Sequence, residues 1–326
     1  MKDNVRIYYY FIIGAIGGLT GWYLSTILGN NLGEDFAAET LGKGIAYYAL
    51  FGATLGAVIG VAVSAYDGIS NRSWQRFVKF GVIGFLLGAI AGAISLPLID
   101  WMYQSLVGAA AQAKSSGGNK TLLTFLIGSL CWVLFGGFIG LGEGIGKGTQ
   151  AWKGVLGGML GGLLGGVIYE INRAVNPPSS LAEDNFNSHF FSAVSFTLLG
   201  ASVSASVAFV TSALKSAWVE VLDGKLAGRN YDITKYVDKN LGAAKSGIIG
   251  SDEWSSHVYL PGDNEVLAHH AEISYTNGSP TITATPEASK HQTTYLNGRR
   301  LTHSSPLVNG DRIQVGSTNL IYRNTK

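Results

Sequence analysis

Charged residues are scarce in this sequence, and cysteine is almost absent. Only 13% of the 326 residues are charged, whereas about a quarter are charged in an ordinary soluble domain. The 23 basic and 21 acidic side chains leave a net charge of +2, so nothing attracts the chain to nucleic acid in general. Cys131 is the single cysteine, which excludes an intramolecular disulfide. The composition favours a membrane protein and argues against a nucleic-acid-binding one.

Patterns typical of catalysis and metal binding are also missing. His269 and His270 are neighbours in an expected strand, so their side chains point to opposite faces and do not share a metal ion. Residues 140–149 contain glycines and a lysine as a P-loop does, but Gly148 stands where Ser or Thr is required. No nucleophile is paired with a base in any pattern. We therefore expect no enzyme, no cofactor and no bound metal.

Glycine, by contrast, is abundant, with 45 residues. Two rows of glycines with four-residue spacing run through residues 154–167, separated by Val, Leu and Met. The rows are Gly154, Gly158, Gly162 and Gly166, and Gly157, Gly161 and Gly165. On a helix they form one bare face. Each interior glycine costs a helix in water about 1 kcal/mol, but in hydrocarbon an unpaired backbone costs more, and a bare face lets another helix approach closely. The segment is therefore predicted to be a membrane helix that packs through its glycines.

Six runs with few charged residues can cross a bilayer, since about 20 helical residues span the ~30 Å hydrocarbon core. The fifth uncharged run, residues 154–169, is short, but Lys153 and Glu170 at its ends can extend their charged groups to the interface. Membrane helices are predicted over residues 6–28, 44–66, 78–99, 121–145, 152–172 and 188–215. Residues 98–113 either extend the third helix or lie along the surface. Together these helices make a first domain, residues 1–217, that is expected to lie in the lipid bilayer.

The basic residues are unevenly divided between the two sets of loops. With the N-terminus inside, the cytoplasmic side carries Lys2, Arg6, Arg72, Arg76, Lys79, Lys147, Lys153 and Lys215. The other side carries only Lys43, Lys114, Lys120 and Arg173. An excess of lysine and arginine marks the cytoplasmic side. Both termini are therefore expected in the cytoplasm.

The glycine pattern recurs with a period of about 77 residues. The first unit has Gly52, Gly56 and Gly60, then Gly81, Gly84 and Gly88; the second has Gly136 and Gly140, then Gly158, Gly161 and Gly165. The first helix resembles the second half of such a unit, and the sixth resembles a first half. Trp74, Trp152 and Trp218 recur at the expected cytoplasmic ends, where tryptophan anchors at the interface.

Asp67 and Glu143 occupy matching places in the two units. An ionisable group within a membrane marks a functional site by default, which would suit a channel or transporter. Both, however, lie near the cytoplasmic end with a base close by, Arg72 and Lys147 respectively. We favour an ion pair at each position.

After Trp218 the pattern changes to the alternation of short strands. Two strands are expected around the turn that contains Gly224, and others at 256–260, 270–275, 280–284, 293–296, 312–315 and 318–323. Turns rich in Asn and Gly separate them. Many short strands with regular turns predict a β-sandwich over residues 218–326.

Five sequence blocks in this second domain follow the order of a known family. They are Ile249-Gly250 opening a strand, Val258–Asp263, Val266–Ile273, Thr294–Gly298 and Leu307–Gly316. The region resembles a forkhead-associated (FHA) domain. The resemblance implies a sandwich whose loops at one end recognise phosphothreonine peptides. The whole layout resembles bacterial membrane proteins that carry a degenerate FHA domain, which implies the bacterial inner membrane.

The family's binding residues are altered in this chain. Ser251, Leu267 and Ala268 stand where the family has an arginine, a phosphate-contacting serine and a basic residue, and Gln292 aligns with its backbone-holding asparagine. His270, which braces the loop in the family, remains, and the resemblance places it and Thr294 in the peptide-binding set with these four residues. Phosphate recognition needs charge-assisted donors, ideally a guanidinium, and neither serine nor leucine is one. Substitute donors are available from Lys290, Arg299 and Arg300.

These features predict a membrane-anchored scaffold subunit whose cytoplasmic FHA-like domain docks a protein partner without strict dependence on phosphothreonine. It would belong to a membrane complex or a homo-oligomer. The alternative is a channel or transporter subunit regulated by the domain. Residues 215–218 contain no flexible linker, so the domain is expected to dock against cytoplasmic loops. Its acidic residues Asp252, Glu253, Asp263 and Glu265 would face the bases of segments 72–79 and 147–153.

Overall fold

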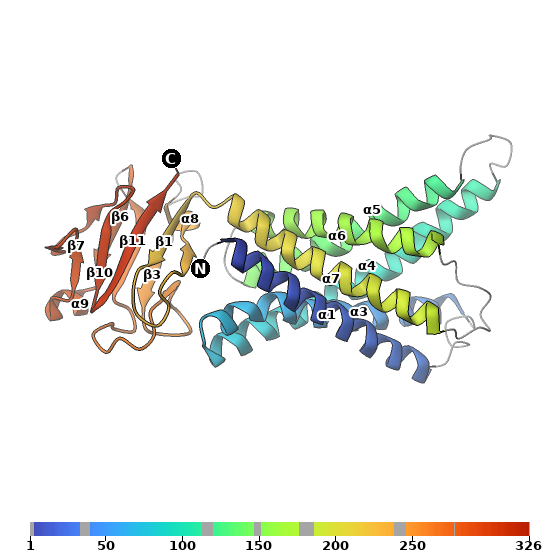
Figure 1. Ribbon diagram of the computed structural model, residues 1–326, viewed down its shortest axis with the longest axis horizontal. Helices are drawn as coiled ribbons and strands as arrows, with labels where there is room; N and C mark the ends of the chain where they lie inside the picture. Colours follow the sequence, from blue (N-terminus) through green and yellow to red (C-terminus); the bar gives the residue numbers. More distant parts are fainter. Residues whose placement is uncertain are drawn as a thin grey trace. The chain divides into compact units, whose positions relative to one another are not determined.

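The computed structural model describes residues 3–32, 40–112, 120–146, 151–175, 186–237, 246–276 and 278–325 (Figure 1). The chain divides into two compact units. The helical unit comprises residues 6–69 and 77–212. The β-containing unit combines Ala213–Lys326 with the segment Ser70–Arg76 and the start of the chain. The assignment of Ser70–Arg76 to the β-containing unit is not evident from the sequence.

Six helices in the described part of the chain are long and apolar enough to cross a membrane. They are α1 (Asp3–Leu32), α3 (Leu41–Ser70), α4 (Trp74–Gln112), α5 (Lys120–Gly146), α6 (Ala151–Val175) and α7 (Phe186–Ala213). Residues 98–112 extend the third predicted span, because α4 continues through Pro97. Proline is tolerated inside a membrane helix, since neighbouring groups can satisfy the freed carbonyl. The predicted sixth span ends two residues early, at Ala213, where the chain turns toward the first strand.

Glycines bring antiparallel helices into backbone contact. Along α3 and α4, Gly52, Gly56 and Gly60 face Gly92, Gly88 and Gly84, and a methyl group on any of them would overlap a carbonyl oxygen opposite. In α5 and α6 the pairs Gly136–Gly158 and Gly140–Gly154 repeat this contact, and Gly14 and Gly200 do so in α1 and α7. The two terminal helices therefore form a third pair of the same kind.

Other contacts join one pair to the next. A methyl group on Gly17 of α1 would lie 2.7 Å from the Ala62 Cβ of α3, and one on Gly142 of α5 would lie 3.1 Å from the Leu87 Cβ of α4. Gly157, Gly161 and Gly165 of α6 lie against the backbone of α7. Each helix thus touches its successor, and α7 touches α1, so the bundle closes into a ring.

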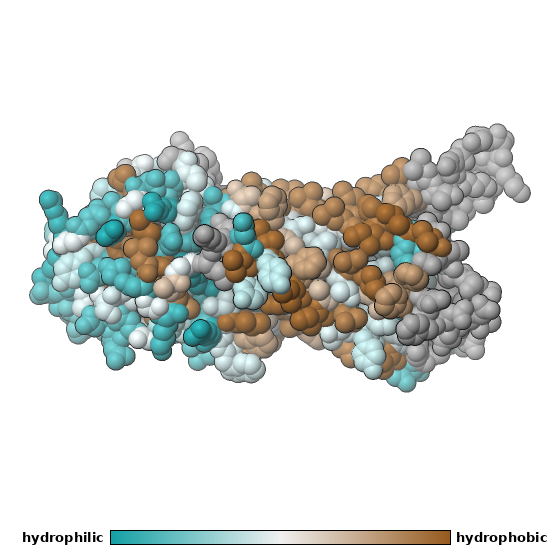
Figure 2. Space-filling model, in the orientation of Figure 1, coloured by the Kyte–Doolittle hydropathy of each residue, from teal (hydrophilic) through white to brown (hydrophobic). Residues whose placement is uncertain are grey.

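Within this ring, α3, α5 and α7 are more buried than α1, α4 and α6. Their membrane spans are 50%, 56% and 61% buried, against 28%, 33% and 44% for the others. Leu55, Phe135 and Leu199, one from each inner helix, are fully buried in a shared core. The outer helices expose leucine, isoleucine and phenylalanine, which form much of the brown surface in Figure 2. In α6 all seven glycines of the two rows are buried and Met159, Leu160, Leu163 and Leu164 are exposed.

The contacts revise the alignment of the two repeats. Gly60 packs on Gly84, and Gly136 packs on Gly158, so Gly158 corresponds to Gly84. The sequence alignment matched Gly158 with Gly81 instead, three residues away, because several glycines in each helix share nearly the same spacing. The glycine that each of them packs against shows which of the two alignments is correct.

The β-containing unit is a two-sheet sandwich (Figure 1). One sheet has the order β2-β1-β11-β10-β7-β8, from Asn230–Asp232, Ala217–Val221, Thr318–Asn324, Arg312–Val315, Thr294–Leu296 and Arg299–Arg300. The other has the order β4-β3-β5-β6-β9, from Val258–Tyr259, Gly247–Gly250, Ala271–Thr276, Ser279–Ala284 and Ser305–Pro306. Alternate residues such as Val219, Ile273 and Ile313 fill the core between the sheets.

Two details of the sandwich differ from the sequence interpretation. Ile249 and Gly250 end strand β3 and do not open a strand, because the chain leaves the sheet at Ser251. Two short helices were not expected: α8 (Thr234–Val237) and α9 (Pro286–His291). Thr285 caps α9 by accepting a hydrogen bond from the Ala288 N–H, and Pro286 begins the helix, where its fixed φ suits the first turn.

Candidate peptide-binding site

The loop after β3 and the loop before β5 are joined through Ser251. Its backbone N–H donates to the Leu267 carbonyl (2.9 Å), and its hydroxyl donates to the Val266 carbonyl (2.8 Å). The Ser256 hydroxyl donates to the Ala268 carbonyl (3.3 Å). Residues 251, 267 and 268 therefore lie close together in space. The Ser251 hydroxyl is used to hold the loops together.

His270 braces the same loop from inside the domain. It is completely buried, its Nδ1 accepts from the Leu267 N–H (3.1 Å), and its Nε2 lies 3.0 Å from the Thr294 hydroxyl. Because Nδ1 accepts, a neutral ring carries its proton on Nε2 and donates it to Thr294. Thr294 is also buried. The Thr294 hydroxyl therefore supports His270 from below the surface.

The burial of His270 makes the sandwich sensitive to acid. Burial lowers the pKa of His270 below its ordinary value of 6.5, so the unfolded chain takes up a proton at a pH where the folded domain does not. Stability is therefore fully present above about pH 6.5 and is lost as the pH falls toward the folded-state pKa, by at most ~1.4 kcal/mol per pH unit. We expect His270→Asn, whose amide oxygen can still accept from Leu267, to remove this dependence. Hydrogen exchange of β5 and β6 at pH 7.5 and 5.5 measures it, and an equal acid sensitivity of the variant would contradict it.

The loop between β3 and β4 contains a polar network that the sequence did not predict. The Ser255 N–H donates to Asp252 Oδ2 (2.7 Å), the Ser255 hydroxyl donates to the same oxygen, and His269 Nε2 lies 2.6 Å from that hydroxyl. The hydrogen bond from Ser255 lowers the pKa of Asp252. A hydroxyl has one proton, so with Asp252 as acceptor His269 must be the donor to Ser255. The arrangement orders the loop and gives Ser255 no general base.

Exposed basic residues lie around the segment between β6 and β7. Lys290 is in the last turn of α9, and Arg299 and Arg300 form β8. Arg300 donates to the Ser289 carbonyl (3.2 Å), which ties β8 to α9. Gln292 follows α9 in the left-handed conformation, with φ 58°, and is exposed. These residues form a basic rim, defined here as Lys290, Arg299 and Arg300.

The segment Ser70–Arg76 packs on the β3–β4 loop within the β-containing unit. Arg76 is buried, its Nε donates to the Glu253 carbonyl (2.9 Å), and its guanidinium also donates to the Ser256 carbonyl. The same group lies 4.8 Å from the centre of the Tyr259 ring. The Ser73 hydroxyl donates to the Glu253 carboxylate. The Tyr231 hydroxyl donates to Asn71 Oδ1 (2.9 Å). The β3–β4 loop is thus held in place by the segment that joins α3 to α4, together with the first turn of α4.

The other residues selected from the sequence lie in different places. The Glu253 carboxylate accepts a hydrogen bond from Ser73 and its carbonyl accepts one from Arg76, whereas Asp263 accepts hydrogen bonds from Ser317 and Thr318. Segment 147–150, with Lys147, lies outside the described residues, and of Glu143 only the backbone position in α5 is described.

The other polar and aromatic residues that the sequence pointed to lie near helix ends and in strand β1. Asp67 is partly buried near the end of α3. Trp74 and Trp152 are exposed in the first turns of α4 and α6. Trp218 lies in β1, with the Lys215 ammonium 4.7 Å from its ring centre. Over the described residues no group of three or more His, Cys, Asp or Glu side chains could hold a metal ion.

Comparison with known proteins identifies the C-terminal domain. The FHA domain family model matches residues 247–316. No curated protein matches the chain. Solved structures similar to this chain include the FHA domain of CT664 protein from Chlamydia trachomatis (21% identity, TM-score 0.28, 34% of this chain and 99% of that chain). A second is the FhaA FHA domain complexed with the intracellular domain of Rv3910 (22% identity, TM-score 0.26, 33% of this chain and 100% of that chain).

A third similar structure covers more of the chain. Mycobacterium tuberculosis EmbR in complex with a low affinity phosphopeptide has 13% identity and a TM-score of 0.26, over 82% of this chain and 71% of that chain. The family match, the two-sheet sandwich and the helical spans agree with one another. The chain therefore carries a C-terminal FHA domain, a protein-interaction module, after an N-terminal region of six long apolar helices.

Proposed function

We propose that this chain is a membrane-anchored interaction subunit. Its six helices cross the bacterial inner membrane with both termini in the cytoplasm, and its FHA domain binds a protein partner there. The distribution of basic residues supports this orientation. Arg6, Arg76, Lys79 and Lys153 lie in the first turns of α1, α4 and α6, and Lys215 follows the end of α7. In a chain whose helices cross the membrane in turn, these ends fall on the same side, and an excess of lysine and arginine marks the cytoplasmic side. The subunit would act as a scaffold in a membrane complex or a homo-oligomer.

Partner binding would not depend strictly on phosphothreonine. The observation that carries this point is the Ser251 hydroxyl, which donates to the Val266 carbonyl at the position where the family supplies an arginine. Leu267 beside it offers only hydrocarbon and its backbone. A phosphate dianion needs charged donors to replace its hydration, and these two side chains provide none. The basic rim suits acidic side chains of a partner, which carry less charge than a phosphate.

Peptide titration tests this proposal. We expect the full chain to bind a phosphothreonine peptide and its unmodified form with affinities within about threefold, a difference of less than 1 kcal/mol. The double variant Ser251→Arg, Leu267→Ser restores a guanidinium and a hydroxyl, and should favour the phosphorylated form by at least about tenfold. Calorimetry with a library of peptide pairs makes the measurement. A phosphorylated peptide that the unaltered chain prefers by tenfold or more would refute phosphate independence.

Purification of the chain with its bound proteins tests whether the FHA domain binds a protein partner. Full-length chain purified from its native membrane should retain a specific protein, and the charge-reversed variant Arg299→Glu, Arg300→Glu should lose it. The two arginines are exposed, so the change should leave the sandwich folded. If the unaltered chain and the variant retain the same proteins, the FHA domain is not the docking surface.

A further inference from the structure

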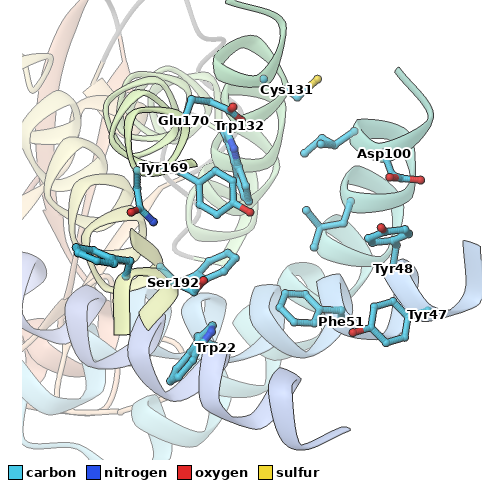
Figure 3. Close-up of a pocket in the computed structure, with 16 residues that line it drawn as sticks. Trp22, Tyr47, Tyr48, Phe51, Asp100, Cys131, Trp132, Tyr169, Glu170 and Ser192 are labelled. Atoms are coloured by element: carbon cyan, nitrogen blue, oxygen red, sulfur yellow. The ribbon is translucent and has the colours of Figure 1, made fainter. Parts of the chain in front are cut away.

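The helical unit contains a partly open cavity of about 520 Å³ to which all six helices contribute (Figure 3). It lies toward the ends of α1, α4 and α6 and the beginnings of α3, α5 and α7. This is the end of the bundle away from the α3–α4 connection. A cavity of this size is in the range that binds small organic molecules, about 300–1,000 Å³.

Aromatic side chains dominate the wall of this cavity. Eight of its sixteen lining residues are Trp, Tyr or Phe, drawn from α1, α3, α5, α6 and α7. Trp132 is at the centre of the aromatic group, with its ring 4.9 Å from Tyr169 and 6.0 Å from Phe196. Aromatic faces carry partial negative charge and attract cations, most strongly when water is excluded.

Two carboxylates also line the cavity. Glu170 is 95% buried, at 5% relative exposure, and its carboxylate lies over Gly128, where a methyl group would overlap it. Asp100 interacts with the Tyr48 hydroxyl. In Figure 3 the two acids lie on different sides of the space, Asp100 with Tyr48 and Glu170 beside Trp132. Among the described residues that line the cavity, none is lysine, arginine or histidine.

We infer that this cavity binds an organic cation, an ammonium group that carries apolar substituents. Aromatic rings would surround the substituents, and the carboxylates would balance the charge in a setting where an unbalanced charge is costly. An anion would be repelled by the two carboxylates. A bare metal ion would need several oxygen ligands together, whereas the two carboxylates lie apart. This binding site is separate from the FHA domain and does not depend on the function proposed for it.

The test uses two ligands of the same shape that differ only in charge. Benzyl(2-hydroxyethyl)dimethylammonium is the cation, and 3,3-dimethyl-4-phenylbutan-1-ol is its neutral isostere. We expect calorimetry on the full chain, in uncharged maltoside micelles, to show saturable binding of the cation at least about tenfold tighter than that of the alcohol. Equal affinities, or no saturable binding of the cation, would overturn the inference.

Variants assign the binding to this cavity. Glu170→Gln should lower the affinity for the cation by at least about tenfold and change the affinity for the alcohol by less than about twofold. Asp100→Asn, at a less buried position, should act in the same direction and serves if the first variant does not fold. Asp67→Asn removes a carboxylate near the opposite end of α3 and is the matched control. If Asp67→Asn weakens binding as much as the cavity variants, the cation binds elsewhere and the inference fails.

The cation could be a free solute or the headgroup of a lipid. Adding phosphatidylcholine to the micelles distinguishes these sources. Competition between the lipid and the probe would support a headgroup as occupant, and undiminished probe affinity would support a free solute.

Discussion

Gly88→Ala should destabilise the helical unit, and Gly81→Ala in the same helix should not. A methyl group on Gly88 would overlap the Gly56 carbonyl, so α3 and α4 would have to separate. The overlap involves backbone, which cannot move aside as a flexible side chain can. We expect the unfolding free energy to fall by about 1–3 kcal/mol, the usual cost of overpacking.

Gly81 provides the matched control. A methyl group there would lie 3.9 Å from the Ala65 Cβ and 4.0 Å from the Val61 Cγ1, which is ordinary contact distance. Gly81→Ala should therefore leave stability unchanged or raise it slightly, since alanine is the better helix former. Unfolding of the full chain in mixed micelles, followed by far-ultraviolet circular dichroism, compares the two. Equal stabilities of the two variants would show that the Gly56–Gly88 contact does not hold the pair together.

Replacing Arg76 by glutamine should release the β3–β4 loop of the FHA domain. The change removes the guanidinium that donates hydrogen bonds to the carbonyls of Glu253 and Ser256. Each buried acceptor left without a donor lowers the stability of the folded loop by about 1–3 kcal/mol. With about 2 kcal/mol lost, hydrogen exchange in residues 251–257 should become roughly 30-fold faster. Exchange measured by mass spectrometry on the full chain reports this directly.

Arg72→Asn is the control for the loss of charge. Arg72 is exposed and has φ 52°, a left-handed conformation that asparagine tolerates better than most residues. Exchange in the same loop should stay within about threefold, because surface changes of this kind are usually worth less than 0.5 kcal/mol. If both variants accelerate exchange alike, net charge controls the loop and the Arg76 contacts do not.

The positions of the helices in the chain could be derived from local pattern. Which residues of one helix pack against which residues of another could not. The run of residues 154–167 predicts its helix because hydrocarbon penalises an unpaired backbone whatever the neighbours are. The same glycines fit two alignments of the repeat, and only the packing of Gly158 on Gly136 selects one. The pairing of α1 with α7 joins opposite ends of the helical region, and no local spacing carries that information.

In the FHA domain, too, local pattern predicted the strands and turns but not the contacts between side chains. The alternation of residues in strands such as β1 and the turns with Asn and Gly predicted a sandwich. The order of blocks around His270 predicted where the recognition loops lie. That Thr294 is buried beneath His270, and that Ser255 contacts His269, depends on side chains brought together from separate strands and loops.

Six apolar helices followed by an FHA sandwich could be derived from the amino-acid sequence, because hydrophobic length, strand period and turn residues act over a few neighbours. The closed ring of helices, the aromatic cavity that Glu170 and Asp100 share, and the contact of Arg76 with a loop of the FHA domain could not. Each of these depends on residues far apart in the chain. Side-chain packing fixes the distances between these residues. Other sequences with the same local pattern would pack differently and would bring different residues together.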